Sequence, residues 1–509
     1  MSAPDPIYLD YAATTPVDPA VAEAMVRSLT EAGGIGNASS VTHRFGRRVA
    51  ERLERARAEV AALIGAASEE IIFTSGATES NNLAILGAAR ANTHRGRHLV
   101  SARTEHKAVL DPLKRLQKEG FTVTLVSPDG AGRIAPEAVA AALRPDTVLT
   151  SIMLVNNEIG VIQDVAAIAA LCRSRGVLFH SDAAQAAGKM PLDAHAAALD
   201  LMSLTAHKLY GPKGIGALYV RREARARLQP IIFGGGQERG LRPGTLPTHQ
   251  IVGFGVACDL ARRALPAEHA RLMALRERLW RGLAAVGGVQ LNGAGAPSVP
   301  GIVNVSIEGV EGESLLAGLG ELALATGSAC NSASAEPSYV LRALGRDTQL
   351  AQSSLRVSFG RFSAPEHIDL AAAAIGREVA RLRALSPASE PPSGPARAPK
   401  SHPAASAANV AEVVGEAGGA GQEVWVRFRL RVRGGVVMSA LFKAYGCPDT
   451  LAAAAWVAER LPGRGRGELA PGTPAEWAER LAVPAEKLGR LLIVEDALAD
   501  CARHWPEAG

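Results

Sequence analysis

Cysteines, long apolar runs and an excess of charge of one sign are all scarce in this sequence, and each shortage excludes a class of protein. Its 509 residues contain five cysteines, none of them in a Cys-x-x-Cys pair, so no disulfide framework is indicated. No stretch approaches roughly 18 consecutive apolar residues, and no basic segment followed by an apolar one opens the chain, so neither a membrane span nor a secretory signal is expected. We therefore expect a cytoplasmic protein whose thiols stay reduced.

The net charge of the chain is small. Its 55 basic and 50 acidic residues leave a formal charge of +5, too little to indicate a nucleic-acid-binding surface. Apolar residues make up 47% of the chain, which is enough for a sizeable core. The length predicts about two to four domains.

One segment has the composition of a linker. Residues 387–408 contain six prolines, seven alanines, four serines and one glycine among 22 residues, without apolar periodicity. Such a segment cannot bury enough surface to offset the entropy of ordering it, so we expect a semi-extended linker that spans about 25–30 Å. It divides the chain into a body, residues 1–386, and a tail domain, residues 409–509.

The body alternates short apolar runs with Ala-rich segments of helical length, which predicts an α/β fold with a mostly parallel sheet covered on both faces. The expected strands are 71–73, 98–100, 121–126, 148–155 and 177–180, and the helices between them include 135–143 and 166–174. Beyond residue 262, a long charged helix over 267–283 and sparser strands favour a smaller α+β lobe. We therefore place a large domain over 1–261, with an N-terminal segment shared with the small lobe, and the small lobe over 262–386.

Polar, titratable residues follow four of these strands and also a short apolar run that ends at Leu204. In open α/β sheets the ligand lies beyond the carboxyl ends of the strands, so this edge is the predicted site. The segments that follow the strands are 74–79, 104–107, 156–158, 181–185 and 205–208.

Three features at this edge together suit one cofactor. The turn 75–78 leads into a helix whose N-terminal N–H groups suit a phosphate, although a plain helix cap is the commoner role of such a turn. Asp182 could pair with a pyridinium nitrogen and Lys208 could form a Schiff base with an aldehyde, although a simple ion pair explains the same residues. Together they describe pyridoxal phosphate, with His106 either stacking on the ring and moving protons or serving only the structure.

Eight runs of sequence carry a resemblance to a known family. They are 8–16, 73–82, 104–110, 155–160, 207–214, 239–247, 327–330 and 353–362. Together they closely resemble the class I cysteine desulfurases of the IscS/NifS type, over residues 6–387 and without large gaps. The resemblance implies a fold-type I pyridoxal-phosphate enzyme that forms a homodimer.

The resemblance also implies roles for individual residues. Lys208 matches the Schiff-base lysine, His106 the stacking acid–base histidine, and Arg356 the arginine that binds the substrate carboxylate with a bidentate guanidinium. Further residues match those that contact the cofactor in the family: Ala77, Thr78, Asn157, Asp182, Gln185, Thr205, His207 and Thr245. Of these, Asn157 is also expected at the substrate, and Thr245 is expected to come from the neighbouring subunit. Thr205 stands where a serine is usual, and either hydroxyl can donate to a phosphate. No resident metal is expected.

Cys330 decides the expected reaction. It lies in a run of small residues, 325–334, whose side chains make few packing contacts, so a loop there can move at little cost in free energy. The alternative is a buried cysteine that serves only the packing of the core. The resemblance implies that L-cysteine displaces Lys208, that Lys208 and His106 move protons, and that the Cys330 thiolate takes the sulfur, leaving alanine and a persulfide. Cys172 and Cys258 fall in helical apolar patterns and are expected in the core.

The tail is predicted to be a small α+β domain, with a hairpin of strands over 424–432 and 435–445 followed by helices. Four alternating arginines between 427 and 433 predict a solvated face of the sheet. Segments 442–447 and 491–497 are similar to the IscU-type iron–sulfur scaffold, but Cys447 is the only scaffold cysteine present. Because a cluster needs about four ligands, one thiol cannot hold it in the ordinary way, and the module is expected to be degenerate.

Three functions remain open for the tail: a persulfide acceptor that uses Cys447, half of a site shared with another protein, or a docking module without chemistry of its own. Cys501 and His504 could supply two more ligands, although a chance coincidence on one helix face is the simpler explanation. The expected partners are L-cysteine and an iron–sulfur scaffold or other sulfur acceptor, with the chain's own tail as one candidate, and neither nucleic acid nor membrane. The alternatives for the body are a selenocysteine lyase, a related lyase or aminotransferase, and a non-catalytic assembly platform.

Overall fold

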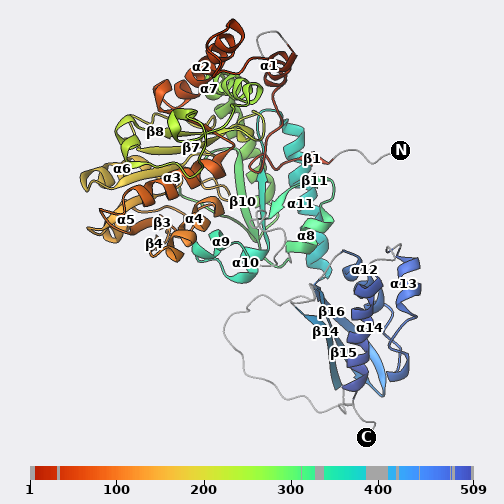
Figure 1. Ribbon diagram of the computed structural model, residues 1–509. Helices are drawn as coiled ribbons and strands as arrows, with labels where there is room; N and C mark the ends of the chain where they lie inside the picture. The colour runs from red at the N-terminus through yellow and green to blue at the C-terminus, as the bar shows by residue number, and fades with distance from the viewer. Residues whose placement is uncertain are drawn as a thin grey trace. The chain divides into compact units, whose positions relative to one another are not determined.

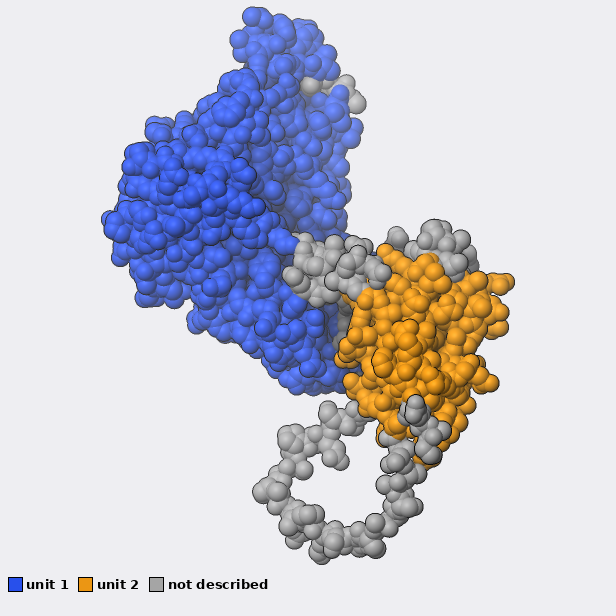
Figure 2. Space-filling model, turned by 60° about the horizontal axis from the view of Figure 1, so that its bottom comes forward, with its two compact units in different colours: residues 1–391 blue, residues 392–509 orange. Residues whose placement is uncertain are grey.

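The computed structural model describes most of the chain in two compact units, residues 1–391 and 392–509, drawn in different colours in Figure 2. The described residues are 6–30, 35–310, 312–326, 337–385, 411–419, 424–445, 448–481, 483 and 488–505. The boundary between the units falls inside the expected linker, 387–408, which lies outside the described residues. Each unit is described by itself.

The first unit is built on a seven-stranded sheet in the order β2, β8, β7, β6, β5, β3, β4 (Figure 1). The strands are β2 (Ile71–Thr74), β8 (Gly216–Val220), β7 (Leu201–Thr205), β6 (Leu178–Asp182), β5 (Thr147–Ser151), β3 (His98–Ala102) and β4 (Thr122–Val126). From β7 to β4 every pair is parallel, whereas β8 runs antiparallel to both of its neighbours. The predicted mostly parallel sheet is confirmed, and β8 is a strand that the apolar pattern did not show.

Different helices cover the two faces of this sheet. Neighbouring residues such as Leu99 and Val100, or Leu178 and Phe179, belong to separate apolar cores because successive side chains of a strand point to opposite faces. The helices α3 (Ala77–Ala91) and α4 (Lys107–Lys118) pack on one face. The other face is covered by α2 (Arg44–Leu63), α5 (Pro136–Ala142), α6 (Val165–Ser174) and the first half of α7 (Thr248–Ala284).

Helix α7 is longer than expected and joins the two cores of this unit. Its 37 residues run unbroken across the expected boundary between 261 and 262. Phe254 and Ala261 pack in the large core, whereas Leu272 and Leu279 pack in the core of the small lobe. The charged pattern of 267–283 therefore describes only the second half of the helix. Helix α1 (Pro19–Thr30) packs against α7 as well.

The small lobe contains a four-stranded antiparallel sheet. Its order is β12 (Ala325–Thr326), β13 (Ser354–Ser358), β10 (Ile302–Ile307) and β9 (Val289–Leu291). Its helices are α8 (Gly312–Gly318), α9 (Tyr339–Ala343), α10 (Thr348–Gln352) and α11 (Pro365–Leu385). The N-terminal strand β1 (Ile7–Tyr8) pairs in parallel with β11 (Leu322–Ala323), so the start of the chain returns to this lobe.

The tail unit is a three-stranded antiparallel sheet covered by helices on one face. The strands are β14 (Ala411–Gly419), β15 (Val424–Arg433) and β16 (Val436–Tyr445), and the helices are α12 (Pro448–Ala458), α13 (Pro474–Arg480) and α14 (Leu488–Arg503). The predicted hairpin is β15–β16. Strand β14 was missed, and the last of the predicted helices is α14.

The arginines of β15 lie on the open face of the tail sheet, as predicted. Arg429, Arg431 and Arg433 are exposed and Arg427 is half-exposed, while the alternating Val426, Phe428 and Leu430 are buried. Arg427 and Arg429 pair with Glu416 and Glu412 of the neighbouring strand. Among the helices that the structure describes, none is long and apolar enough to cross a bilayer.

Candidate active site

The sequence-predicted residues gather where the parallel strands of the large sheet end. Asp182 and Thr205 are the last residues of β6 and β7, and His106 precedes α4 after β3. A short 3-10 turn, Ala206–Lys208, follows β7 directly and carries His207 and Lys208. The expectation that this edge concentrates polar side chains is confirmed.

The turn before α3 is shaped to receive an anion. Gly76 precedes the helix with a φ of 151° and a ψ of −179°, a conformation that residues with a side chain rarely adopt, and no side chain caps the helix. A Cβ placed on Gly76 would lie 3.8 Å from the hydroxyl of Thr205, so the glycine keeps open the space in front of that hydroxyl. The N–H groups at Ala77 and Thr78, the helix dipole and the Thr205 hydroxyl therefore fit a phosphate.

Asp182 is buried and held from two sides. Its Oδ2 accepts a hydrogen bond of 2.7 Å from Asn81 Nδ2, and its Oδ1 accepts one of 2.9 Å from the amide of Ala184. Neither partner carries a charge, so the carboxylate keeps its own charge for a cationic ligand such as a pyridinium nitrogen. Asn81 lies one turn into α3, and sequence reasoning missed it.

His106 is held in one tautomer by the backbone that follows it. Its Nδ1 accepts a hydrogen bond of 3.0 Å from the amide of Ala108, so a neutral ring carries its proton on Nε2. Burial lowers the pKa of His106 below its usual value; the charge of Asp182 opposes this shift and that of Lys208 adds to it. The ring is therefore neutral and donates from Nε2.

Two buried carboxyl groups that sequence reasoning missed flank the site. Glu105, beside His106, accepts a hydrogen bond of 2.8 Å from the amide of Met153, while its Oε2 has no partner within the described residues. Burial raises the pKa of Glu105 well above its usual range. Glu158 lies 2.5 Å from the hydroxyl of Ser338, and burial raises its pKa to about 7. Both residues lie in the segments 104–107 and 156–158, which the sequence analysis placed after strands. The sequence does not show which carboxyl groups of those segments are buried.

Arg356 and Asn157 lie together, as expected of a pair that receives a substrate. Arg356, on β13, donates to the carbonyl oxygen of Asn157 at 3.0 Å and to Asp10 at 2.7 Å. The Nε of Arg356 and the Oδ1 of Asn157 are buried without a partner in the described structure. Orphaned polar atoms of this kind fit a ligand that carries both acceptors and donors, such as an amino-acid substrate bound next to the cofactor.

Gln185 and His207 contact the N-terminal segment. Gln185 Nε2 donates to the carbonyl of Ala12 at 2.7 Å, and His207 Nδ1 lies 3.1 Å from the hydroxyl of Thr14. Burial, followed by the charges of nearby lysines, lowers the pKa of His207 to about 4, so its ring is neutral at physiological pH. Both side chains are thereby fixed at the edge where the cofactor is expected.

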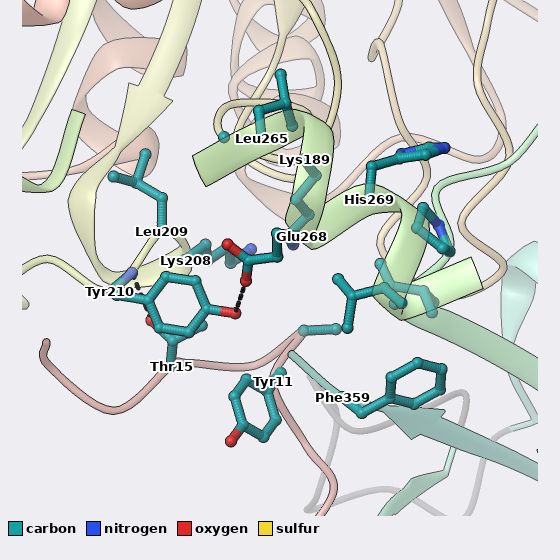
Figure 3. Close-up of a pocket in the computed structure, with 16 residues that line it drawn as sticks. Tyr11, Thr15, Lys189, Lys208, Leu209, Tyr210, Leu265, Glu268, His269 and Phe359 are labelled. Carbon is teal, nitrogen blue, oxygen red and sulfur yellow. Dashed lines mark hydrogen bonds between the residues drawn. The ribbon is translucent and has the colours of Figure 1, made fainter. Parts of the chain in front are cut away.

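Lys208 lines an enclosed cavity of about 30 Å³ next to the sheet edge. The cavity is shared with a second lysine, Lys189, and with Tyr210 and Glu268 (Figure 3). Tyr210 donates to Glu268 at 3.2 Å. The space holds about one water molecule.

The predicted cysteines divide into two groups. Cys172 and Cys258 are fully buried in the large core, as expected, and burial raises the pKa of Cys172 to about 11. Cys330 and Cys447 lie outside the described residues. Thr245 is exposed in the segment before α7, so this chain does not bury it in its own site.

Comparisons with known proteins cover the first unit. The family model for class-V aminotransferases matches residues 7–370. The chain is 54% identical over 382 residues to the cysteine desulfurase IscS of Serratia proteamaculans and 56% identical to that of Aeromonas hydrophila, in each case over 75% of this chain and 95% of the relative. Among solved structures, a NifS-like protein superposes with a TM-score of 0.68 at 34% identity, covering 74% of this chain and 100% of its own. The structure of SspA in complex with cysteine gives a TM-score of 0.63 at 36% identity, over 70% of this chain and 100% of its own.

The raised pKa of Glu158 predicts how the stability of the first unit depends on pH. Its pKa of about 7 in the folded protein lies above the value of 4.5 in an unfolded chain, so the folded state binds the extra proton and stability falls as pH rises through that window. Glu158→Gln removes this loss, so at about pH 8 the variant is expected to gain up to about 3 kcal/mol over the wild type, and close to nothing at about pH 4. Urea denaturation at the two pH values measures the difference.

Glu137→Gln is the matched control, because Glu137 is exposed on α5 and makes no such buried contact. It should leave the pH dependence of stability unchanged. An equal effect of Glu158→Gln at both pH values would show that the carboxyl is ionised throughout and would contradict the prediction.

Proposed function

Because the chain belongs to the class-V aminotransferase family and is a pyridoxal-phosphate-dependent cysteine desulfurase, we propose that Lys208, His106 and Cys330 carry its reaction. The observation that supports the assignment of Lys208 and His106 is the arrangement at the sheet edge, where they and Asp182 are brought together from three different strand ends. The products are L-alanine and, in our proposal, a persulfide on Cys330.

The described residues fit the cofactor. When bound, pyridoxal phosphate supplies an aldehyde that bonds an amine and a ring that withdraws electrons from it. We assign its phosphate to the amides at Ala77 and Thr78 with the Thr205 and His207 side chains. Asp182 is assigned to the ring nitrogen, and Asn157 and Gln185 to the ring hydroxyl.

The chain's own residues bind the substrate and move its protons. The guanidinium of Arg356, already oriented by Asp10, binds the carboxylate of L-cysteine, and Asn157 stands beside it. The amine of Lys208 takes the proton from the α-carbon of the substrate and returns it at the end of the reaction. His106 is assigned the second proton-transfer role: its neutral ring donates a hydrogen bond from Nε2 to the substrate, and it acts as an acid when the ring has taken up a second proton.

Sulfur transfer needs a nucleophile that attacks sulfur rather than carbon. In the proposed step the Cys330 thiolate attacks the sulfur of the substrate, a sulfur–sulfur bond forms and the carbon–sulfur bond breaks. The electron pair stays with the carbon, which takes a proton and becomes the methyl group of alanine. The persulfide then passes to an acceptor, for which an iron–sulfur scaffold protein is the proposed partner.

Replacing Cys330 separates desulfuration from the other reactions of this fold. Cys330→Ala is expected to keep the yellow colour of the bound cofactor but to lose turnover of L-cysteine by at least a hundredfold, because no thiol remains to take the sulfur. Alanine and sulfide release, measured together, report the loss.

Lys208→Ala is the companion variant. It should lack the absorption band of the cofactor bonded to Lys208. If Cys330→Ala turned over L-cysteine at the wild-type rate, the assignment would fail and the competing selenocysteine lyase or aminotransferase activity would take its place. A wild-type protein that stays colourless after reconstitution would instead favour a non-catalytic platform.

We also propose that the protein forms a homodimer in which Thr245 reaches the phosphate of the neighbouring subunit. Thr245 is exposed, and two apolar side chains upstream of it, Ile232 and Phe233, are 47% and 84% exposed. Apolar surface of this kind is covered in an assembly more often than it is left in water. The cytoplasmic location remains a prediction.

For the tail, we propose a degenerate IscU-like module in which Cys447 accepts sulfur from Cys330. The supporting observation is the position of Cys447 in the chain, between β16, which ends at Tyr445, and α12, which begins at Pro448. Cys501 is buried against the sheet, whereas His504 is exposed, so these two do not form a joint site. Within the described residues no cluster of three or more metal-ligating side chains occurs.

Persulfide mapping tests transfer to the tail. After the full-length protein is given L-cysteine, mass spectrometry should find persulfide on Cys330 and Cys447 in the wild type, and on Cys330 alone in Cys447→Ser. Cys330→Ala should leave both positions without persulfide, because the tail has no other source of sulfur. A wild type that never labels Cys447 would reject the acceptor function and leave a docking module or a half-site shared with another protein.

A further inference from the structure

A carboxylate lies inside the turn that is assigned to the phosphate of the cofactor. Glu79 is the third residue of α3, and its Oε2 accepts a hydrogen bond of 2.6 Å from the amide of Ser75. Its Oε1 accepts one of 2.9 Å from Nε of Arg242, and the side chains of Glu79 and Arg242 are only 12% and 21% exposed. A negative charge is therefore held, largely out of water, at a turn where an anion is expected to bind.

The carboxylate has a structural use in this turn. Gly76 offers no side chain to cap α3, and Glu79 reaches back across the turn to fix the amide of Ser75. That amide lies outside the helix. The first N–H groups of the helix itself, at Ala77 and Thr78, have no partner within a helix and so suit an anion.

The same carboxylate has an electrostatic cost. A phosphate monoester carries a charge of about −1.5 to −2 at neutral pH, and like charges a few ångströms apart repel strongly where little water lies between them. Burial opposes the ionisation of Glu79, but the hydrogen bonds from Arg242 and Ser75 outweigh it, so the pKa of Glu79 lies below its usual value. Without a counter-charge, this carboxylate would weaken the binding of a phosphate at the turn.

We propose that Arg242 is a positioning residue for the cofactor: its guanidinium neutralises Glu79, so that the carboxylate can hold the phosphate turn without repelling the phosphate. Arg242 binds the carboxylate oxygen that Ser75 does not use, so one side chain shapes the turn and the other cancels its charge. The proposal deepens the proposed function, because it rests on the phosphate being bound at this turn.

The loop that carries Arg242 is fastened to the strand that leads into the turn. Glu238 accepts a hydrogen bond of 2.6 Å from the amide of Phe73, in β2, and forms a buried ion pair of 2.7 Å with Arg57. The next residue, Arg239, donates from Nη1 to the carbonyl of Ile71 at 3.3 Å, also in β2. Strand β2 ends directly before the phosphate turn, so the loop and the turn are held to the same strand.

The backbone of this loop is strained where it is fastened. Glu238 and Arg239 have φ angles of 47° and 57°, in the left-handed region that residues with a side chain rarely adopt. Such conformations persist only where surrounding contacts hold them, and they gather at functional sites. Here the contacts that hold them also bring Arg242, three residues further on, to Glu79.

The test compares the affinities of the cofactor-free, full-length protein for pyridoxal phosphate and for pyridoxal at about pH 8. Both aldehydes can bond Lys208, so the ratio of the two affinities isolates the phosphate. Arg242→Met is expected to lower this ratio by about tenfold or more, because the charge of Glu79 is left uncompensated. The absorption band of the bonded aldehyde, followed during titration, gives both affinities.

The partner variant is expected to act in the opposite direction. Glu79→Gln removes the negative charge, keeps an oxygen that can accept from Ser75, and leaves Arg242 in place, so the ratio should rise above that of the wild type. A loosened turn could lower the ratio but could not raise it. A ratio that falls in Glu79→Gln would therefore overturn the proposal.

The double variant separates charge balance from direct contact. Glu79→Gln combined with Arg242→Met removes both charges and should return the ratio to within about threefold of the wild type. If Arg242 instead contacted the phosphate directly, or served only to hold the loop, the double variant would bind as weakly as Arg242→Met. That result would overturn the role proposed for Arg242.

Two further variants serve as controls. Arg242→Lys keeps the positive charge and should keep the ratio close to that of the wild type. Arg222→Met breaks an ion pair of 2.5 Å with Glu69, which precedes the other end of β2, and should leave the ratio unchanged. If Arg242→Met does not fold, Arg242→Gln removes the same charge with a polar side chain, and the same fall is expected of it.

The outcomes also separate this proposal from the assignment of the phosphate site. A wild type that binds pyridoxal as tightly as pyridoxal phosphate would overturn that assignment itself. A wild type that prefers pyridoxal phosphate, with Arg242→Met showing the same preference, would overturn the role of Arg242 and leave the phosphate at its turn.

Discussion

The chemistry of this protein depends on the parallel alignment of neighbouring strands. Because β3, β5, β6 and β7 run in one direction, the residues that follow them meet at a single edge, although they come from distant parts of the sequence. At that edge the ionisable groups are held by amides more than by opposite charges. Asp182 is fixed by Asn81 and a backbone N–H, so its charge remains available to a bound cation.

Burial without counter-charge gives the site its electrostatic character. The carboxyl groups of Glu105 and Glu158 have raised pKa values and carry less negative charge than they would in water. The charged groups of the site are then Lys208, Asp182 and the Arg356–Asp10 pair. Both the phosphate of the cofactor and the carboxylate of the substrate are anions, and the reduced charge of the two buried carboxyl groups lowers the repulsion that these anions meet.

The body of the fold could be predicted from the sequence because its buried strands are continuous apolar runs and its helices lie between them. Strand β14 could not, because alanine, glycine and glutamate form no apolar run, and its pairing with β15 sets its structure. The first half of α7 was seen only as the helical apolar pattern around Cys258 and was not joined to 267–283, because it is buried on the large core and lacks the charges that mark 267–283. In the site, the residues that directly follow strands could be predicted from the sequence. The partners Asn81 and Asp10 lie 101 and 346 residues from the side chains they hold, a separation at which no local pattern operates.

The ion pair between Asp10 and Arg356 has a consequence for how the molecule matures. During translation Asp10 leaves the ribosome early, whereas its partner Arg356 follows only after most of the first unit has been made. In the same way, strand β1 cannot pair until β11 has been translated. This ion pair can therefore form only after β13 has emerged, when α11 is the one helix of the first unit still to come among the described residues. The tail is translated later still, so it emerges after every residue of this ion pair and of the β1–β11 pairing has left the ribosome.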